Sequence, residues 1–263
     1  MDTFERISGL LLEMGEFACD AQADILRGYK DDGTVLTQTD LIISEKVIAL
    51  IRDLFPKANI VTEETLTPFC KDAELTFILD PIDGTDVYSQ GLPSWCIALG
   101  ILDANHKCIG GMVNAPRWGL SRNEGLFLRQ DPGKPMLLNG KAFSVASKKD
   151  DFEQIAMASH AHRYLDLSQF KGKMRCYGSN ILHMVSPLIH SHIQGSVSVP
   201  CYAWDVAAAH ALLLSQDMVV TYADGSPFEY DDRILVERQA FRGILVAGPP
   251  IVAGRLSRLV KFL

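Results

Sequence analysis

The feature that most constrains this chain is a short apolar run that ends in an acidic turn. Residues 75–79 have the pattern of a β-strand and lead directly into the sequence Asp80-Pro81-Ile82-Asp83-Gly84-Thr85-Asp86. A buried strand would deliver Asp80 at its carboxyl end, and a tight turn can direct Asp80 and Asp83 at one point. Gly84 allows a backbone geometry that other residues avoid. Two converging carboxylates repel each other, and a hard divalent cation with oxygen ligands removes that cost.

Two other interpretations of this turn are open on the local sequence. Asp, Pro and Gly are common turn residues, so a solvated surface turn is the simpler one. A calcium loop of the EF-hand type is the second, but its D-x-D-x-D-G spacing and terminal Glu are missing. The apolar residues 77–79 favour a buried approach to Asp80, because the tips of surface hairpins usually have polar flanks.

Two further acidic segments stand beside apolar ones. Glu63-Glu64 follows the strand-like Ile60-Val61, and Asp205 opens the apolar segment 206–209. Taken alone, Glu63-Glu64 is a solvated pair and Asp205 is a helix cap, which contributes about 1 kcal/mol. Further sequence features that connect these segments are needed before Glu63, Glu64 and Asp205 can be assigned to one site.

Composition and charge narrow the class of protein. The chain has 263 residues, of which 48% are hydrophobic and 22% charged, as in globular proteins. The net charge of −7 without a dense Lys/Arg run argues against a nucleic acid partner. No apolar stretch approaches the ~20 residues of a spanning helix, and no signal peptide is recognisable, so no membrane partner is expected. The six cysteines form no C-x-x-C pair, and we expect reduced thiols in the cytoplasm.

Hydrophobic periodicity predicts a mixed α and β chain in two halves. It predicts helices over residues 3–29 and from 39 or 40 to 55, followed by the strands 59–62, 75–79, 95–102 and 108–113 with antiparallel pairing. Residues 129–149, rich in Pro, Gly and Lys, are the candidate boundary. Beyond it we expect strands at 154–158, 196–199, 218–222 and 243–247, and helices at 181–190, at 204–214 and from 249–250. The predicted halves are residues 1–145 and 146–263, joined in one structural unit.

Together the acidic segments resemble the inositol monophosphatase family, within the larger group similar to fructose-1,6-bisphosphatase. Residues 80–85 match the family motif Asp-Pro-Ile/Leu-Asp-Gly-Thr, and residues 204–208 match its Trp-Asp followed by small residues. Residues 62–64 match its Gly-Glu-Glu in part, and residues 36–40 are similar to its Val-Thr-x-x-Asp. The motifs follow the family's order along nearly the whole chain. The resemblance implies an α+β or α/β fold, a layered αβαβα sandwich with the site between the halves.

The resemblance also implies a set of site residues. It places a first metal on Glu63, Asp80 and the carbonyl of Ile82, a second on Asp80, Asp83 and Asp205, and a weaker third near Glu63. The expected ion is Mg²⁺, two or three per site, with Mn²⁺ as the alternative. Thr85, paired with Asp40, would orient or activate the attacking water, so the expected catalytic residues are Thr85, Asp40 and Glu63. The expected substrate contacts are Asp83, Gly84, Thr85, Gly178, Ser179, Ser198 and Asp205.

The implied activity is Mg²⁺-dependent hydrolysis of a small phosphorylated alcohol of the inositol monophosphate kind. Some positions depart from the family pattern. Ser198 stands where the inositol enzymes have a Glu that contacts inositol hydroxyls, and Thr62, Val87 and residues 215–218 also differ. Histidinol phosphate, a sugar phosphate or bisphosphate, and 3′-phosphoadenosine 5′-phosphate are therefore the alternative substrates. A metal-binding scaffold without activity is the alternative of another class. The family also implies lithium sensitivity and a homodimer.

Overall fold

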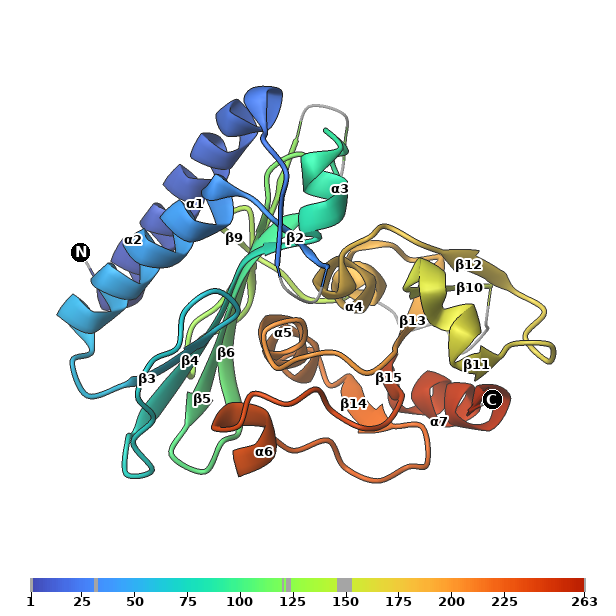
Figure 1. The fold of residues 1–263 in the computed structure, drawn as a ribbon. Helices are drawn as coiled ribbons and strands as arrows, with labels where there is room; N and C mark the ends of the chain where they lie inside the picture. The colour runs from blue at the N-terminus through green and yellow to red at the C-terminus, as the bar shows by residue number, and fades with distance from the viewer. Residues whose placement is uncertain (1, 31–32, 120, 122–123, 146–152, 263) are drawn as a thin grey trace.

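The computed structural model describes residues 2–30, 33–119, 121, 124–145 and 153–262, and its main elements form five layers (Figure 1). The first layer is the helix pair α1 (Thr3–Ala21) and α2 (Gln38–Leu54). It covers a seven-stranded sheet, and helices α4 (Asn180–Ile189) and α5 (Ala207–Leu214) cover the other face of that sheet. A five-stranded sheet and helix α7 (Pro250–Leu259) complete the stack. The predicted αβαβα sandwich is confirmed.

The two sheets hold the strands that position the site. In spatial order the first sheet consists of β3 (Asn59–Thr62), β4 (Leu75–Asp83), β5 (Cys96–Asp103), β6 (Cys108–Ala115), β7 (Leu126–Gln130), β8 (Leu137–Leu138) and β9 (Lys141–Ala142). The second sheet consists of β12 (Lys173–Arg175), β10 (Gln154–Met157), β13 (Ile193–Ser198), β15 (Leu245–Gly248) and β14 (Val219–Tyr222).

Shorter elements connect the layers. They are η1 (Gln22–Asp24), β1 (Gly28–Tyr29), β2 (Val35–Leu36), α3 (Thr85–Ser89), η2 (Ser159–Arg163), β11 (Leu165–Asp166), α6 (Asp232–Leu235) and β16 (Lys261–Phe262). None of the helices in the described ranges is both long and apolar enough to span a membrane.

Alternation along β4 explains why its end is buried. Phe77 and Leu79 pack in the core beneath α1 and α2, whereas Ile78 packs in the core that contains α4 and α5. Successive side chains of a strand point to opposite faces, so a strand covered on both sides is apolar at every position. The continuous apolar run before Asp80 therefore reflects a central strand between two helical layers.

The structure confirms most of the predicted elements and corrects three of them. Residues 80–83, expected as a tight turn, are the end of β4, because Asp83 pairs again with Cys96 of β5 after a register shift. The first helix ends at Ala21 rather than near Tyr29, because the buried amide of Gln22 donates to the carbonyl oxygens of Tyr88 (2.8 Å) and Leu92 (3.0 Å). The chain then turns into the β1–β2 hairpin. Antiparallel pairing is confirmed from β4 to β7 but is wrong for β3, which runs parallel to β4.

The predicted boundary over residues 129–149 is partly structured. Strands β8 and β9 lie within it and continue the first sheet as far as Ala142. Residues 146–152 lie outside the described ranges, and the second sheet begins with Gln154. We keep the division at 145/146 as a proposal.

Candidate active site

Three carboxylates from two distant segments meet at the carboxyl end of β4. Asp80 and Asp83 belong to the end of this strand, and Asp205 lies two residues before α5. Each of the three offers one oxygen within 4.8 Å of the others. Asp80 and Asp83 are buried and Asp205 is partly buried. We call these three residues the aspartate trio.

The trio is an arrangement that protein groups alone do not neutralise. Burial raises the pKa of Asp80 well above its ordinary value, and the nearby carboxylates of Glu63, Asp83 and Asp205 raise it further. Oxygen Oδ1 of Asp80 is buried and has no hydrogen-bond partner in the described residues. Burial likewise raises the pKa of Asp205, with Asp83 as the next cause. Carboxylates that repel one another, one of which has a buried oxygen without a donor, fit a hard divalent cation.

Asp83 is held in place by the start of α4, which comes from the second half of the sequence. Its carboxylate accepts hydrogen bonds from the backbone N–H of Ile181 (2.6 Å) and of Asn180 (3.3 Å), and from the hydroxyl of Ser179. Burial raises the pKa of Asp83 to about 6, although these donors act against the rise. A carboxylate at a helix N-terminus also interacts favourably with the helix dipole. These contacts fix the direction of Asp83 in the absence of metal.

Asp40 and Thr85 form the second polar group of the site. Asp40 is the third residue of α2 and closes a capping box with Thr37. Its Oδ2 accepts from the backbone N–H (2.9 Å) and the hydroxyl (2.5 Å) of Thr37. Its other oxygen accepts from the hydroxyl of Thr85 at 3.2 Å. The same hydroxyl lies 2.9 Å from the carbonyl oxygen of Ile82. Burial raises the pKa of Asp40 to about 6.

Glu63 is not a member of the trio and is paired with a lysine. It follows β3, and its Oε1 lies 2.6 Å from Nζ of Lys30, which comes from the β1–β2 hairpin. The same ammonium lies 2.8 Å from Oε1 of Glu64. Burial lowers the pKa of Lys30, but these two carboxylates raise this pKa by more, so that it lies above its ordinary value. Glu63 still acts on Asp80 more strongly than any other charge. No distinctive sequence pattern surrounds Lys30, so its place in the site is not predictable from the sequence.

The predicted substrate contacts lie in different surroundings. Gly84 and Gly178 both have φ of +94°, and a Cβ on Gly84 would lie 3.3 Å from the carbonyl oxygen of Gly178. The hydroxyl of Ser179 donates to Asp83, and its side chain is fully buried. Ser198 is the last residue of β13 and is also buried. Contact of these residues with substrate stays a prediction.

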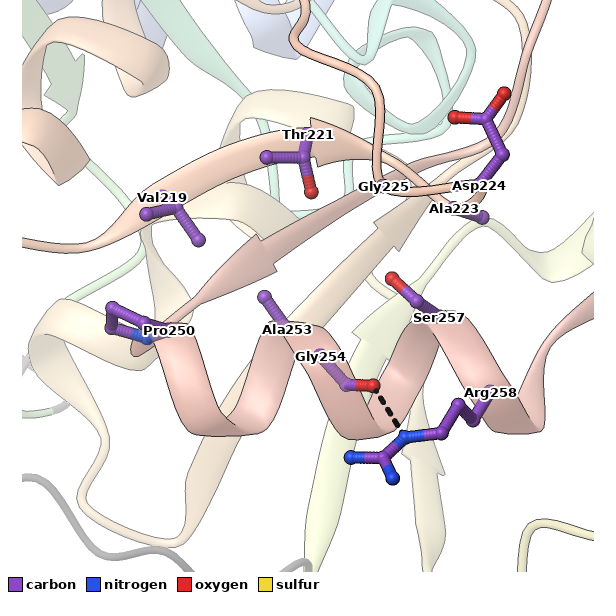
Figure 2. Close-up of a pocket in the computed structure, with 10 residues that line it drawn as sticks. All are labelled: Val219, Thr221, Ala223, Asp224, Gly225, Pro250, Ala253, Gly254, Ser257 and Arg258. Carbon is purple, nitrogen blue, oxygen red and sulfur yellow. Dashed lines mark hydrogen bonds between the residues drawn. The ribbon is translucent and has the colours of Figure 1, made fainter.

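A groove between β14 and α7 has a volume of about 520 Å³ but contains no member of the trio (Figure 2). Each of its two charged residues forms a hydrogen bond with a residue nearby in the sequence. Asp224 accepts from the backbone N–H of Ser226 at 2.8 Å, and Nε of Arg258 donates to the carbonyl oxygen of Gly254 at 3.1 Å. The groove lacks the convergent, unsatisfied polar groups that mark the trio.

Comparison of the sequence with known proteins places it among phosphatases. A sequence model of the Inositol monophosphatase family matches residues 8–247. An inositol monophosphatase of Dictyostelium discoideum is 24% identical over 251 residues, which is 88% of this chain and 84% of the relative. A probable inositol 1-monophosphatase of Mycobacterium tuberculosis is 26% identical over 256 residues, covering 91% and 89%.

The fold is also that of solved structures in this group. An IMPase of Thermotoga maritima superposes with a TM-score of 0.78 and 21% identity, covering 98% of this chain and 96% of that one. An IMPase/NADP phosphatase in complex with Mg²⁺ and phosphate gives a TM-score of 0.80 with 14% identity, covering 97% and 93%. At these identities the likeness establishes the fold.

Proposed function

Since the chain belongs to the inositol monophosphatase family and is a metal-dependent phosphatase, we propose that it hydrolyses the phosphomonoester of a small alcohol with Mg²⁺. One observation carries this proposal, namely the largely buried trio Asp80, Asp83 and Asp205, each of which offers one oxygen within 4.8 Å of the others. Such a constellation is unfavourable as a structural device, because burying like charges together destabilises a fold. It is useful where a divalent cation and a phosphate are to be bound.

The metal ligands that we propose are Glu63, Asp80, the carbonyl oxygen of Ile82, Asp83 and Asp205. The donors are all oxygens, which suits Mg²⁺ and, as the alternative, Mn²⁺. When bound, such ions lower the pKa of a water molecule, offset the charge of the phosphate and stabilise the departing alkoxide. We propose two or three ions per site.

Thr85 and Asp40 are proposed to orient the attacking water. The carboxylate of Asp40 accepts from the Thr85 hydroxyl, and Thr37 holds this carboxylate in a fixed orientation. A hydroxyl held in this way can accept a hydrogen bond from water while it donates to Asp40. Positioning of this kind directs the oxygen lone pair of the water at the phosphorus atom.

The phosphate is proposed to meet the backbone N–H groups of Gly84 and Thr85. Gly84 stands in the left-handed region directly before α3, a conformation that favours glycine. Asp83, Gly178, Ser179, Ser198 and Asp205 are the other proposed substrate contacts. Because the Glu that contacts inositol hydroxyls is replaced by Ser198, the alcohol need not be inositol.

Candidate substrates are inositol phosphates, histidinol phosphate, sugar phosphates or bisphosphates, and 3′-phosphoadenosine 5′-phosphate. The names of relatives include more than one substrate. A relative from Thermotoga maritima is named fructose-1,6-bisphosphatase/inositol-1-monophosphatase, and it is 28% identical over 205 residues, which is 75% of this chain and 74% of the relative. A homodimer, a cytoplasmic location, lithium sensitivity and the absence of a nucleic acid partner remain predictions. The six cysteines are free in the structure, and their reduced state also remains a prediction.

The test is a panel of these phosphomonoesters assayed for phosphate release with Mg²⁺ and with EDTA. We expect one class to give the highest kcat/KM, with activity lost in EDTA. The Asp83→Asn variant should retain the fold and lower kcat/KM by about 10²–10³-fold, the size of effect seen when one electrostatic contact to a transition state is removed. Equal phosphate release by this variant would contradict the proposed site.

A further inference from the structure

Arg238 reaches from the second half of the sequence to the backbone that carries Glu63. It lies in the connection between α6 and β15, with a φ of +55°, and it is partly buried. Its Nη2 donates to the carbonyl oxygen of Glu63 at 3.1 Å and to that of Thr62, and its Nη1 donates to the carbonyl oxygen of Thr65 at 3.1 Å. One side chain thus satisfies three carbonyl groups on both sides of Glu63.

The same guanidinium also contacts the segment that carries Asp205. Its central carbon lies 5.0 Å from the ring centroid of Trp204, the residue before Asp205. The Trp204 ring stacks on Tyr202, with centroids 4.8 Å apart and an interplanar angle of 9°. The backbone N–H of Tyr202 donates to Oδ2 of Asp205 at 2.7 Å. Arg238 is therefore in contact with the neighbours of two predicted metal ligands that are far apart in the sequence.

The chemistry of this contact requires arginine. A guanidinium offers several donors in one plane and stacks on aromatic rings, whereas a lysine ammonium is a compact point charge. Burial lowers the pKa of Arg238, and the carboxylates of Glu63 and Glu64 act in the opposite direction because they attract its positive charge. The side chain therefore combines a planar fork, a ring contact and charge attraction in one place.

We propose that Arg238 is a positioning residue that fixes Glu63 relative to Asp205 and so sets the affinity of the site for divalent metal. This inference rests on the proposed function, because it takes Glu63 and Asp205 as metal ligands. Arg238 acts through the backbone of residues 62–65 and through Trp204. Residues that orient metal ligands typically change metal affinity by 10–100-fold when they are replaced.

The experiment compares Arg238→Met and Arg238→Lys with Arg258→Met as the matched control. Arg258 also donates to a backbone carbonyl, but it lines the groove between β14 and α7 (Figure 2). Calorimetric titration with Mg²⁺ measures the affinity without any turnover. We expect a 10–100-fold weaker Mg²⁺ affinity for both Arg238 variants and an unchanged affinity for Arg258→Met. In assays, the Mg²⁺ concentration for half-maximal rate should rise while kcat at saturating Mg²⁺ changes much less.

Several outcomes would overturn the inference. One is wild-type Mg²⁺ affinity in folded Arg238→Met. Another is wild-type affinity in Arg238→Lys when Arg238→Met does not fold. If neither variant folds without metal while Arg258→Met does, Arg238 serves stability and not metal positioning. A wild-type protein that binds Mg²⁺ but releases no phosphate would instead contradict the proposed function and leave the role of Arg238 in metal affinity standing.

Discussion

The aspartate trio and the Lys30–Glu63–Glu64 triad are two acidic clusters of one site, and they differ in whether a side-chain cation offsets their negative charge. In the triad, one ammonium lies within 2.8 Å of an oxygen of each glutamate. In the trio, no Lys or Arg of the described ranges pairs with Asp80, Asp83 or Asp205, and Asp80 keeps a buried oxygen without a donor. The ammonium of Lys30 therefore offsets part of the charge of the triad, whereas protons or a cation would have to offset that of the trio.

The largest effect should follow from removing charge at the trio. Asp80→Asn should lower kcat/KM by about 10²–10³-fold, because the proposed ligand shared by both metals is lost. The same change should raise the Tm of the metal-free protein, since it removes a buried carboxylate that its neighbours repel. Each 1 kcal/mol corresponds to roughly 2–4 °C for a chain of this size. Thermal unfolding in EDTA checks this, and a lower Tm would show that the trio is not strained without metal.

The pH dependence of stability should separate the trio from ordinary carboxylates. The folded-state pKa of Asp83 is about 6, above the usual value, so the folded protein binds this proton more tightly than the unfolded chain. This contribution is fully present below pH 4 and is lost as the pH rises through about 6. The Tm gain produced by Mg²⁺ should therefore be larger at pH 7.5 than at pH 5. An equal Tm gain at both pH values would contradict the proposal that Mg²⁺ competes with protons for Asp83.

A smaller effect should follow from removing the cation of the triad. Lys30→Met leaves Glu63 and the largely buried Glu64 without this partner, and hydrogen bonds to charged groups contribute about 1.5–3 kcal/mol each. We expect a lower Tm without metal and a larger Tm gain on addition of Mg²⁺, because the ion would replace the ammonium near Glu63. A gain no larger than that of the wild type would show that Lys30 and metal do not compete.

The smallest effect is expected at an exposed ion pair of the same chemistry. Lys71 and Asp232 lie 2.5 Å apart, with side chains that are 71% and 52% exposed. Exposed pairs contribute about 0–1 kcal/mol. Lys71→Met should therefore leave the Tm and the Mg²⁺ response close to those of the wild type. This variant is the matched control for Lys30→Met, and a comparable loss would mean that burial is not what distinguishes the triad.

The sequence predicted the elements that deliver the site better than those that connect them. The continuous apolar run predicted strand β4, and an apolar period with an end before Pro56 predicted helix α2, although β4 continues past Asp80 to Asp83. The end of α1 was misjudged because the contact that stops it, from Gln22 to Tyr88 and Leu92, joins distant segments. Helix α6 was not predicted, because four residues carry no periodic signal.

By itself the sequence determined the acidic motifs, their order and the family to which they belong, since local patterns specify turns and strand ends. The tertiary structure alone decided which groups surround them. It brought Ser179 and the start of α4 to Asp83, Lys30 to Glu63, and Arg238 to both Glu63 and Trp204. The physical reason is that these partners meet across layers through packing, and no spacing along the chain encodes the distance between layers.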